Sequence, residues 1–315
     1  MNDVIVTSNL YGDPTVFVNR LLRITQRAVR ANELLNWGLH PQMADDGSCM
    51  ATDNEGLMAN FGERQFEAAA LWPLMSATDS ISAAAKIFVQ ASQTRQLHAP
   101  ALAALCRSAV ESAGRVVWLL SPEDRQVRRN RCTAVVLAEM KEQTKYNSNE
   151  VASLRQGALS SSPEQMREFI AGSKDLLDRF SELEAEYTLN PDREKVRPFG
   201  TTAELAAMWI EQHVPPHDEG EIRENSMSLG AKRIYALTSA VMHGYKWVND
   251  YLYNGDLFAL IADSFATAVN MTECGVALFE AQAQRVQEAT TRKRCYPPRL
   301  QPTVTAWSKL YVETD

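Results

Sequence analysis

The stretch DPTVFVNRLLRITQRAVRANELLNWG, residues 13–38, decides the fold class of this chain. Asp13 suits the cap of a helix and Pro14 suits its first turn. Apolar side chains then recur at alternating steps of four and three, at Phe17, Leu21, Ile24, Ala28, Ala31 and Leu35. That spacing places them on one face of an amphipathic helix, which must pack against other elements.

The same helical spacing recurs along the chain, and no segment shows the period-two alternation of a group of strands. Apolar stripes run through residues 102–120, 166–187 and 257–279. Residues 221–243 are predicted to form one long helix, and residues 41–60 an irregular loop. The sequence therefore predicts an all-α protein, an irregular multi-helix bundle of about eight helices with an extended C-terminal tail.

Prolines and charges suggest how this bundle is divided. We expect three parts, which are an N-terminal arm at 1–12, a single helical domain at 13–291, and a basic, proline-rich, extended tail at 292–315. Pro191 and Pro198, together with several charged residues, make residues 190–200 the best candidate for an internal linker.

Composition limits the class of protein. The 315 residues carry a formal net charge of −7, so broad attraction to nucleic acid or anionic membranes is not expected, although a local basic groove is compatible with this charge. The five cysteines are an odd number without a CxxC pair, which argues against a disulfide framework or zinc cluster.

The N-terminus does not resemble a signal peptide, and no apolar run reaches the roughly 18 residues of a membrane span. We expect a cytoplasmic protein with no membrane partner.

Several catalytic motifs are missing from the sequence. It contains no GxxxxGK[ST], GxGxxG, HExxH, GxSxG or EF-hand loop, so nucleotide-driven, zincin and α/β-hydrolase functions lose their main support. His213 and His217, followed by two acids, superficially resemble metal ligands. However, Pro215 and Pro216 break the helical register that would align the two imidazoles, and no third ligand is specified. We therefore expect neither a metal nor a cofactor.

The first candidate binding group is a charged helix face. Arg107, Glu111 and Arg115 follow at steps of four, so they share one side of a helix. Two pairs of opposite charge at this spacing can form a solvated ladder. Because the neighbouring residues are small, the face can instead be partly buried against another helix, where each charge needs a partner.

The second candidate is an arginine cluster directly after the first. Arg125, Arg128, Arg129 and Arg131 lie within seven residues. Guanidinium groups match phosphate geometry, so this cluster can bind RNA or an acidic protein partner. Alternatively, it pairs with the nearby acids, which are Glu123, Asp124 and Glu139.

The third candidate is the helix end YALTSAVMHG, residues 235–244. Tyr235, Ser239 and His243 follow one another by single turns, and Gly244 suits a helix C-terminus. A histidine there can donate to phosphate or act as a general acid–base. It can also simply cap the helix and pack against Tyr245 and Trp247.

Together these segments resemble uncharacterised helical proteins of actinobacteria and, more distantly, the HEPN superfamily. The resemblance rests on LCRSAVESA (105–113), on residues 119–131, and on YALTSAVMHG (235–244), which span about half of the predicted core. It implies a helical bundle, often dimeric, that is either a metal-independent RNase of toxin–antitoxin or antiviral systems or an inactive interaction module.

Active members of that superfamily carry an arginine, a polar residue and a histidine on one helix, and His243 matches the histidine. Leu237 and Thr238 stand where the arginine belongs, and Arg233 is too distant. An arginine of another helix, such as Arg107 or Arg128, would have to replace it.

Two functions follow as hypotheses. In the first, the protein is a non-enzymatic interaction or regulatory module, and the Arg–Glu–His cluster is a polar clamp or a partner-binding groove. In the second, it is a metal-independent endoribonuclease in which His243 moves protons and an arginine stabilises the scissile phosphate. The catalytic candidates are then His243, Ser239 and Arg107. The missing arginine and the acidic charge favour the first hypothesis, and a homodimer is the expected assembly.

Overall fold

A computed structural model describes residues 14–94, 96–157, 162–248, 250, 257–285 and 292–312. Across these residues all regular structure is helical, in eleven α-helices and four short 3-10 helices, with no strand. The predicted all-α class is therefore confirmed, while the number of helices exceeds the predicted eight. The predicted N-terminal arm lies outside the described residues. Nowhere in the described part is a helix long and apolar enough to cross a bilayer.

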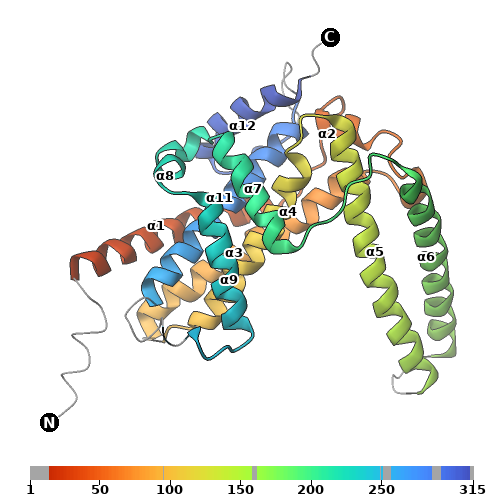
Figure 1. Ribbon diagram of the computed structural model, residues 1–315, viewed down its shortest axis with the longest axis horizontal. Coiled ribbons are helices and arrows are strands. Elements are labelled where there is room, and N and C mark those ends of the chain that lie inside the picture. Colours follow the sequence, from red (N-terminus) through yellow and green to blue (C-terminus); the bar gives the residue numbers. More distant parts are fainter. Residues whose placement is uncertain are drawn as a thin grey trace.

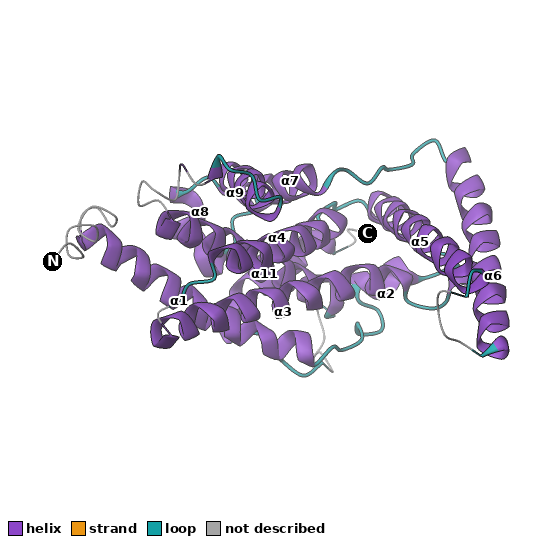
Figure 2. Ribbon diagram, turned by 90° about the horizontal axis from the view of Figure 1, so that it is seen from below, coloured by secondary structure: helices purple, strands orange, loops and turns teal. Residues whose placement is uncertain are grey.

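Four long helices build the core (Figure 2). They are α1 (Pro14–Leu39), α3 (Gln65–Thr94), α4 (Ala99–Leu120) and α11 (Leu257–Ala283), and α11 contacts each of the other three. Every residue of α11 from 267 to 283 is buried. A helix that is buried all round belongs at the centre of a bundle. The edge of one ring meets the face of another between Trp37 and Phe279, with ring centres 5.4 Å apart.

Small residues let the core helices approach closely. A Cβ added to Gly275 of α11 would lie 2.9 Å from Leu74 of α3. Likewise, a Cβ on Gly114 of α4 would lie 3.1 Å from Ala203 of α7 (Phe199–Gln212). A larger side chain at either glycine would force the helices apart, at a cost of about 1–3 kcal/mol.

The predicted long helix over residues 221–243 is wrong. The segment forms two helices, α8 (Glu219–Glu224) and α9 (Met227–Met242). The Ser226 hydroxyl accepts a hydrogen bond from the backbone N–H of Leu229 and so caps a new helix. A side-chain cap of this kind ends one helix and starts the next, while the spacing of the apolar residues continues unchanged.

The predicted loop over residues 41–60 is also partly helical. Ser48 caps the short helix α2 (Cys49–Asn54), and a 3-10 helix follows at Ala59–Phe61. Asp53 of α2 is buried. Six residues are too few to show a helical period, which explains why the sequence pattern did not predict α2.

The predicted extended tail is wrong for the described residues 292–312. They contain α12 (Gln301–Ser308), between 3-10 helices at Pro298–Leu300 and Lys309–Tyr311. Prolines in this segment stand at helix starts, where a missing N–H costs nothing. Val304, Trp307 and Tyr311 lie three and four residues apart and are buried. The Trp307 indole N–H donates to the carbonyl of His213 at 3.0 Å, which fastens the segment to the end of α7.

One pair of helices stands away from the rest of the molecule (Figure 1). They are α5 (Arg125–Arg155) and α6 (Pro163–Leu189), which run side by side in opposite directions and are called the arm below. Asp124 caps α5, and Ser162 with Gln165 forms a reciprocal capping box at the start of α6.

Candidate functional site

Arg107 joins α4 to α9 through Tyr235. Its Nε donates to Glu111 Oε1 at 2.6 Å, and its Nη2 donates to the Tyr235 hydroxyl at 3.2 Å. The guanidinium also lies over the Tyr235 ring, 4.6 Å from the ring centre. Only 15% of the Arg107 side chain and 21% of the Glu111 side chain are exposed. The ion pair within α4 is therefore partly buried, and the contact of Arg107 with Tyr235 holds α4 and α9 together.

Arg115 does not extend this pair along α4. Its Nη1 lies 2.9 Å from Glu139 Oε1 in α5, and its guanidinium lies 5.9 Å from the centre of the Phe199 ring. The spacing on this face allows two ion pairs, Arg107–Glu111 and Glu111–Arg115. Of these two, only Arg107–Glu111 is among the described contacts. Arg115 instead ties the base of the arm to the start of α7.

The end of α9 places His243 at the surface. Gly244 has φ +63° and donates to the Val241 carbonyl, while Tyr245 donates to the Ala240 carbonyl, which together form a Schellman C-cap. The exposed His243 ring stacks on Tyr245, with ring centres 5.6 Å apart.

His243 is separated from the arginine of the α4–α9 clamp. Arg107 reaches α9 at Tyr235, eight residues before the histidine, which is about 12 Å along a helix. Among the described residues, no hydrogen bond or ion pair joins His243 to an arginine. Ser239 is partly buried, and its carbonyl accepts the His243 backbone N–H at 3.0 Å.

Arg128 of the arginine cluster is buried against α2. Its Nε donates to Asp53 Oδ2 at 2.6 Å and its Nη2 to Asp53 Oδ1 at 3.0 Å, which is a bidentate pair. Its Nη1 donates to the carbonyls of Pro122 and Glu123. Burial lowers the pKa of Arg128, but the hydrogen bonds with Asp53 and the attraction of nearby groups, Cys49 and Asp53 among them, together outweigh burial and raise that pKa above its ordinary value. Arg128 therefore stays charged and locks α2 to the start of α5.

The other arginines of the cluster also contact the protein. Arg125 and Arg129 donate to backbone carbonyls of the segment 52–55. Arg131 lies over the Trp118 ring, 4.7 Å from its centre, and donates to the Trp118 carbonyl at 2.5 Å. The cluster thus bonds mainly to α2 and α4, and not to the neighbouring acids that the sequence offers as partners.

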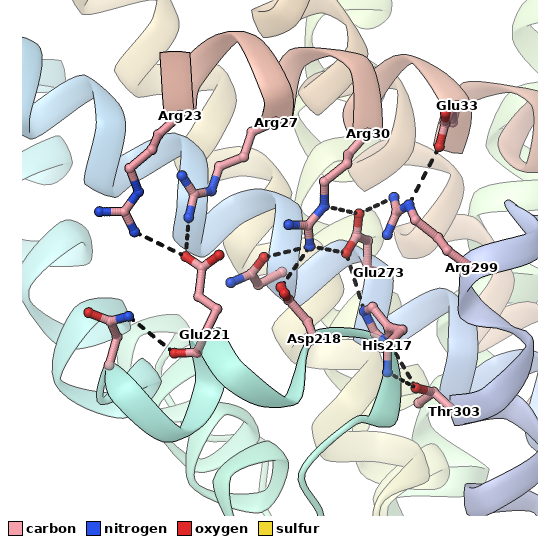
Figure 3. A network of polar contacts seen from close by, with 12 residues as sticks. Arg23, Arg27, Arg30, Glu33, His217, Asp218, Glu221, Glu273, Arg299 and Thr303 are labelled. Atoms are coloured by element: carbon pink, nitrogen blue, oxygen red, sulfur yellow. Dashed lines mark hydrogen bonds and ion pairs between the residues drawn. The ribbon is translucent and has the colours of Figure 1, made fainter. Parts of the chain in front are cut away.

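A larger polar network lies where α1, α11 and the segment after α7 meet (Figure 3). At its centre is Glu273 of α11, whose side chain is fully buried. Arg30 Nε donates to Glu273 Oε1 at 2.9 Å and Arg30 Nη2 donates to Oε2 at 2.5 Å. Arg299 also donates to Oε1, and His217 Nε2 lies 3.2 Å from Oε2. Because the carboxylate accepts, Nε2 of His217 carries a proton, and Nδ1 meets the Thr303 hydroxyl at 2.8 Å.

The charges of this network stabilise one another. Burial by itself raises the pKa of Glu273, but the hydrogen bonds from His217 and Arg30 and the charge of Arg30 outweigh it. The pKa of Glu273 is therefore held well below its usual range, and the residue is ionised at neutral pH. Asp218 accepts from the same Arg30 at 2.8 Å, and Arg27 bonds to Glu221. The network joins five segments but encloses no reactive group open to solvent.

The sequence analysis did not identify this network, although one signal was present. Arg23, Arg27 and Arg30 follow at steps of four and three, and Glu273 and Glu280 lie seven residues apart with only non-polar residues between them. Both spacings put charges on single helix faces. Two acids on one face of a buried helix need cationic partners, which α1 supplies to Glu273.

The two histidines of the superficial metal motif have separate partners. His213 stacks on Trp209, with ring centres 4.5 Å apart, and its Nδ1 meets the Trp209 carbonyl. His217 bonds to Thr303 and Glu273. Within the described ranges, no three His, Cys, Asp or Glu side chains are placed to hold a metal ion.

The base of the arm is fastened by amide side chains. Asn190 and Gln126 both donate to Asn130 Oδ1, at 3.1 and 3.0 Å, and Asn130 Nδ2 donates to the Asp192 carbonyl at 2.9 Å. The Tyr187 hydroxyl donates to the Asn130 carbonyl at 2.8 Å. These bonds fix the end of α6 and the start of the predicted linker 190–200 against α5. The arm is therefore held firmly at its base.

The rest of the arm is barely covered. Leu183 is the only buried residue of α6, and beyond Met140 the only buried residue of α5 is Leu154. The apolar stripe of α6 lies partly exposed, and 49% of Leu177 is open to solvent. The apolar face of α6 is therefore left incompletely packed. Comparison of the chain with models of protein families, with curated proteins and with solved structures finds no match.

Proposed function

We propose that this protein is a cytoplasmic, HEPN-like helical module that acts by binding and not by catalysis, and that its arm pairs with the arm of a second copy. The observation that carries the proposal is the poor burial of α6, in which only Leu183 among 27 residues is buried. Two helices that stand alone gain little from packing, and most helical stability in proteins comes from tertiary packing. A second arm laid across the first would supply that packing and complete a four-helix bundle.

The sequence of the arm favours an antiparallel arrangement of the two copies. Residues 141–157 and 162–174, farther from the base, include five basic and four acidic side chains. Residues 175–189, nearer the base, include one basic and five acidic side chains. A two-fold axis across the arms brings each tip beside the acidic half of the other α6. The tip of one arm and the acidic half of the other α6 then carry opposite net charges at the rim of the interface. This attraction favours the antiparallel arrangement over a parallel one.

The polar groups of the core support binding over catalysis. Arg107 and Arg128 are occupied by Glu111 and Asp53, so neither presents a free guanidinium to a scissile phosphate. The exposed His243 has Tyr245 as its ring neighbour. General acid–base chemistry on a phosphodiester needs a histidine and a charge-stabilising group within reach of the same atom.

The experiment is sedimentation equilibrium of the full chain over a range of concentrations. The wild type is expected to show twice its monomer mass of 35.2 kDa at high concentration. Leu177→Glu adds a charge to the apolar stripe and is expected to weaken the dimer at least tenfold, which is about 1.4 kcal/mol.

Leu229→Glu is the matched control. Leu229 lies in α9, outside the arm, and 65% of its side chain is exposed. This variant is expected to dimerise as the wild type does. A monomeric wild type, or equal weakening by both substitutions, would contradict pairing through the arm.

A further inference from the structure

An apolar cavity of about 210 Å³ lies beside the end of α9. Its walls come from the first turns of α4, from the end of α9, and from the start of α11, and they include Ala103, Val241, Tyr245 and Ile261. Ala103 contributes only a methyl group, which leaves the space between α4 and α11 open. An engineered cavity of about 150 Å³ in another protein holds benzene, so this one suits a molecule slightly larger.

The described walls of the cavity carry no charged side chain. The one ionisable thiol among them is Cys106, which is buried. Burial raises the pKa of Cys106 to about 12, so the thiol stays neutral at physiological pH. A charged ligand would lose its hydration here without gaining a counter-charge. The cavity therefore selects for a neutral molecule.

One polar group in the wall lacks a partner. Ser264 of α11 is only 2% exposed, and its Oγ has no hydrogen-bond partner among the described residues. Other hydroxyls in this protein's helices turn back to a carbonyl four residues earlier, as Thr272 does to Ala268 at 2.7 Å and Thr238 to Ile234 at 2.7 Å. A buried hydroxyl without a partner costs about 1–3 kcal/mol, which a ligand that bonds to it would recover.

We propose that this cavity binds a small, neutral, largely apolar ring compound of about nine non-hydrogen atoms that carries one hydrogen-bonding group for Ser264. Its entrance lies beside Gly244 and the half-exposed Tyr245, at the C-terminal end of α9. The site is distinct from the arm and does not depend on dimerisation. It gives the helix end YALTSAVMHG a role as one wall of a binding site.

Calorimetric titration of the full chain with indole, and with indene as its counterpart without an N–H, tests the proposal. Both have nine ring atoms, so they differ mainly in the hydrogen bond that Ser264 can accept. The wild type is expected to bind indole several-fold more tightly than indene. Ser264→Ala removes that preference and leaves indene binding unchanged. Ala103→Leu fills the cavity and is expected to weaken both ligands at least tenfold.

Ala101→Leu is the control for added volume, because Ala101 lies on the exposed side of the same helix. It is expected to leave both affinities unchanged, and thermal melts verify that each variant is folded. Indole-3-acetate, which adds a carboxylate, is expected to bind at least tenfold more weakly than indole. The proposal is overturned if the wild type shows no binding of indole up to about 1 mM. It is also overturned if the folded Ala103→Leu protein binds indole as tightly as the wild type does.

Discussion

Arg30 and Glu273 lie 243 positions apart in the sequence, and two hydrogen bonds join their side chains where α1 crosses α11 (Figure 3). The carboxylate is fully buried, while about one-fifth of the arginine (21%) remains exposed. Arg299 and His217 also contact the Glu273 carboxylate. This single acid therefore links the first long helix, the central helix and the C-terminal segment of the chain.

Replacing this acid tests its role in stability. Glu273→Gln keeps the size of the side chain but removes the buried counter-charge that Arg30 and Arg299 share, which leaves them only the partly exposed Asp218 and Glu33. Breaking a buried pair in this way is expected to lower the free energy of unfolding by about 3–5 kcal/mol. Chemical denaturation measures the change. Glu33→Gln is the control, because Glu33 is half-exposed and lies 3.5 Å from Arg299. It is expected to cost less than about 1 kcal/mol, and equal losses in the two variants would contradict the central role of Glu273.

The lowered pKa of Glu273 predicts how stability depends on pH. A carboxyl whose pKa is depressed in the folded state stabilises the protein at pH values above its unfolded pKa. That contribution begins to fall as the pH drops through the ordinary glutamate pKa of 4.5, and it continues to fall toward the depressed value. Unfolding curves measured at a series of acidic pH values are expected to show a smaller pH slope for Glu273→Gln than for the wild type. The same slope in both proteins would mean that another acid carries the effect.

The proposed absence of catalysis is tested with RNA. His243 stacks on Tyr245 and makes no bond to a described arginine, so the purified protein is expected not to cleave RNA in EDTA. His243→Ala is expected to behave in the same way. Cleavage by the wild type that is lost in this variant would establish the endoribonuclease alternative. The measurement is the appearance of fragments from a labelled single-stranded RNA.

The cysteines are expected to differ widely in reactivity. Cys106, Cys132 and Cys274 are buried, and burial raises the pKa of each thiol, for Cys106 to about 12. Cys49 is only partly buried, so its thiol is more accessible to a reagent than these three. Native protein treated with maleimide at neutral pH should be modified first at Cys49, as read by peptide mass spectrometry. Early labelling of Cys106 would mean that its helix opens more readily than the packing implies.

The sequence predicted the helical class because apolar spacing is a local property. The stripe of α1 is visible in the sequence from Phe17 to Leu35. A break between two helices that depends on a single hydrogen bond cannot be seen in the apolar spacing. The cap at Ser226 leaves the apolar pattern intact, and α12 follows prolines that suggested an extended chain.

The partners of charged residues could not be predicted from local spacing. For Arg128 the sequence offers either an external phosphate or acidic partner or a nearby acid, yet its partner Asp53 lies 75 positions earlier. Arg115 likewise pairs with Glu139 on the next helix and not with Glu111 on its own. Tertiary packing determines these partners, because it brings carboxylates that are distant in the sequence closer to the arginines than the acids nearby in the sequence. The contact of Arg107 with Glu111 follows from their spacing, whereas its second contact, with Tyr235, depends on how α4 meets α9.

Hydrogen exchange at two protein concentrations tests the central claim most directly. If the arm pairs with the arm of a second copy, backbone amides of α6 gain protection as concentration rises through the dimer dissociation constant, since packing stabilises a poorly buried helix. Amides of α7, which packs within the core, keep the same exchange rate. We predict that exchange becomes slower at the higher protein concentration only in α6 and in its partner helix α5. Exchange in α6 that is independent of concentration over a range from low micromolar to about 1 mM would contradict the proposal.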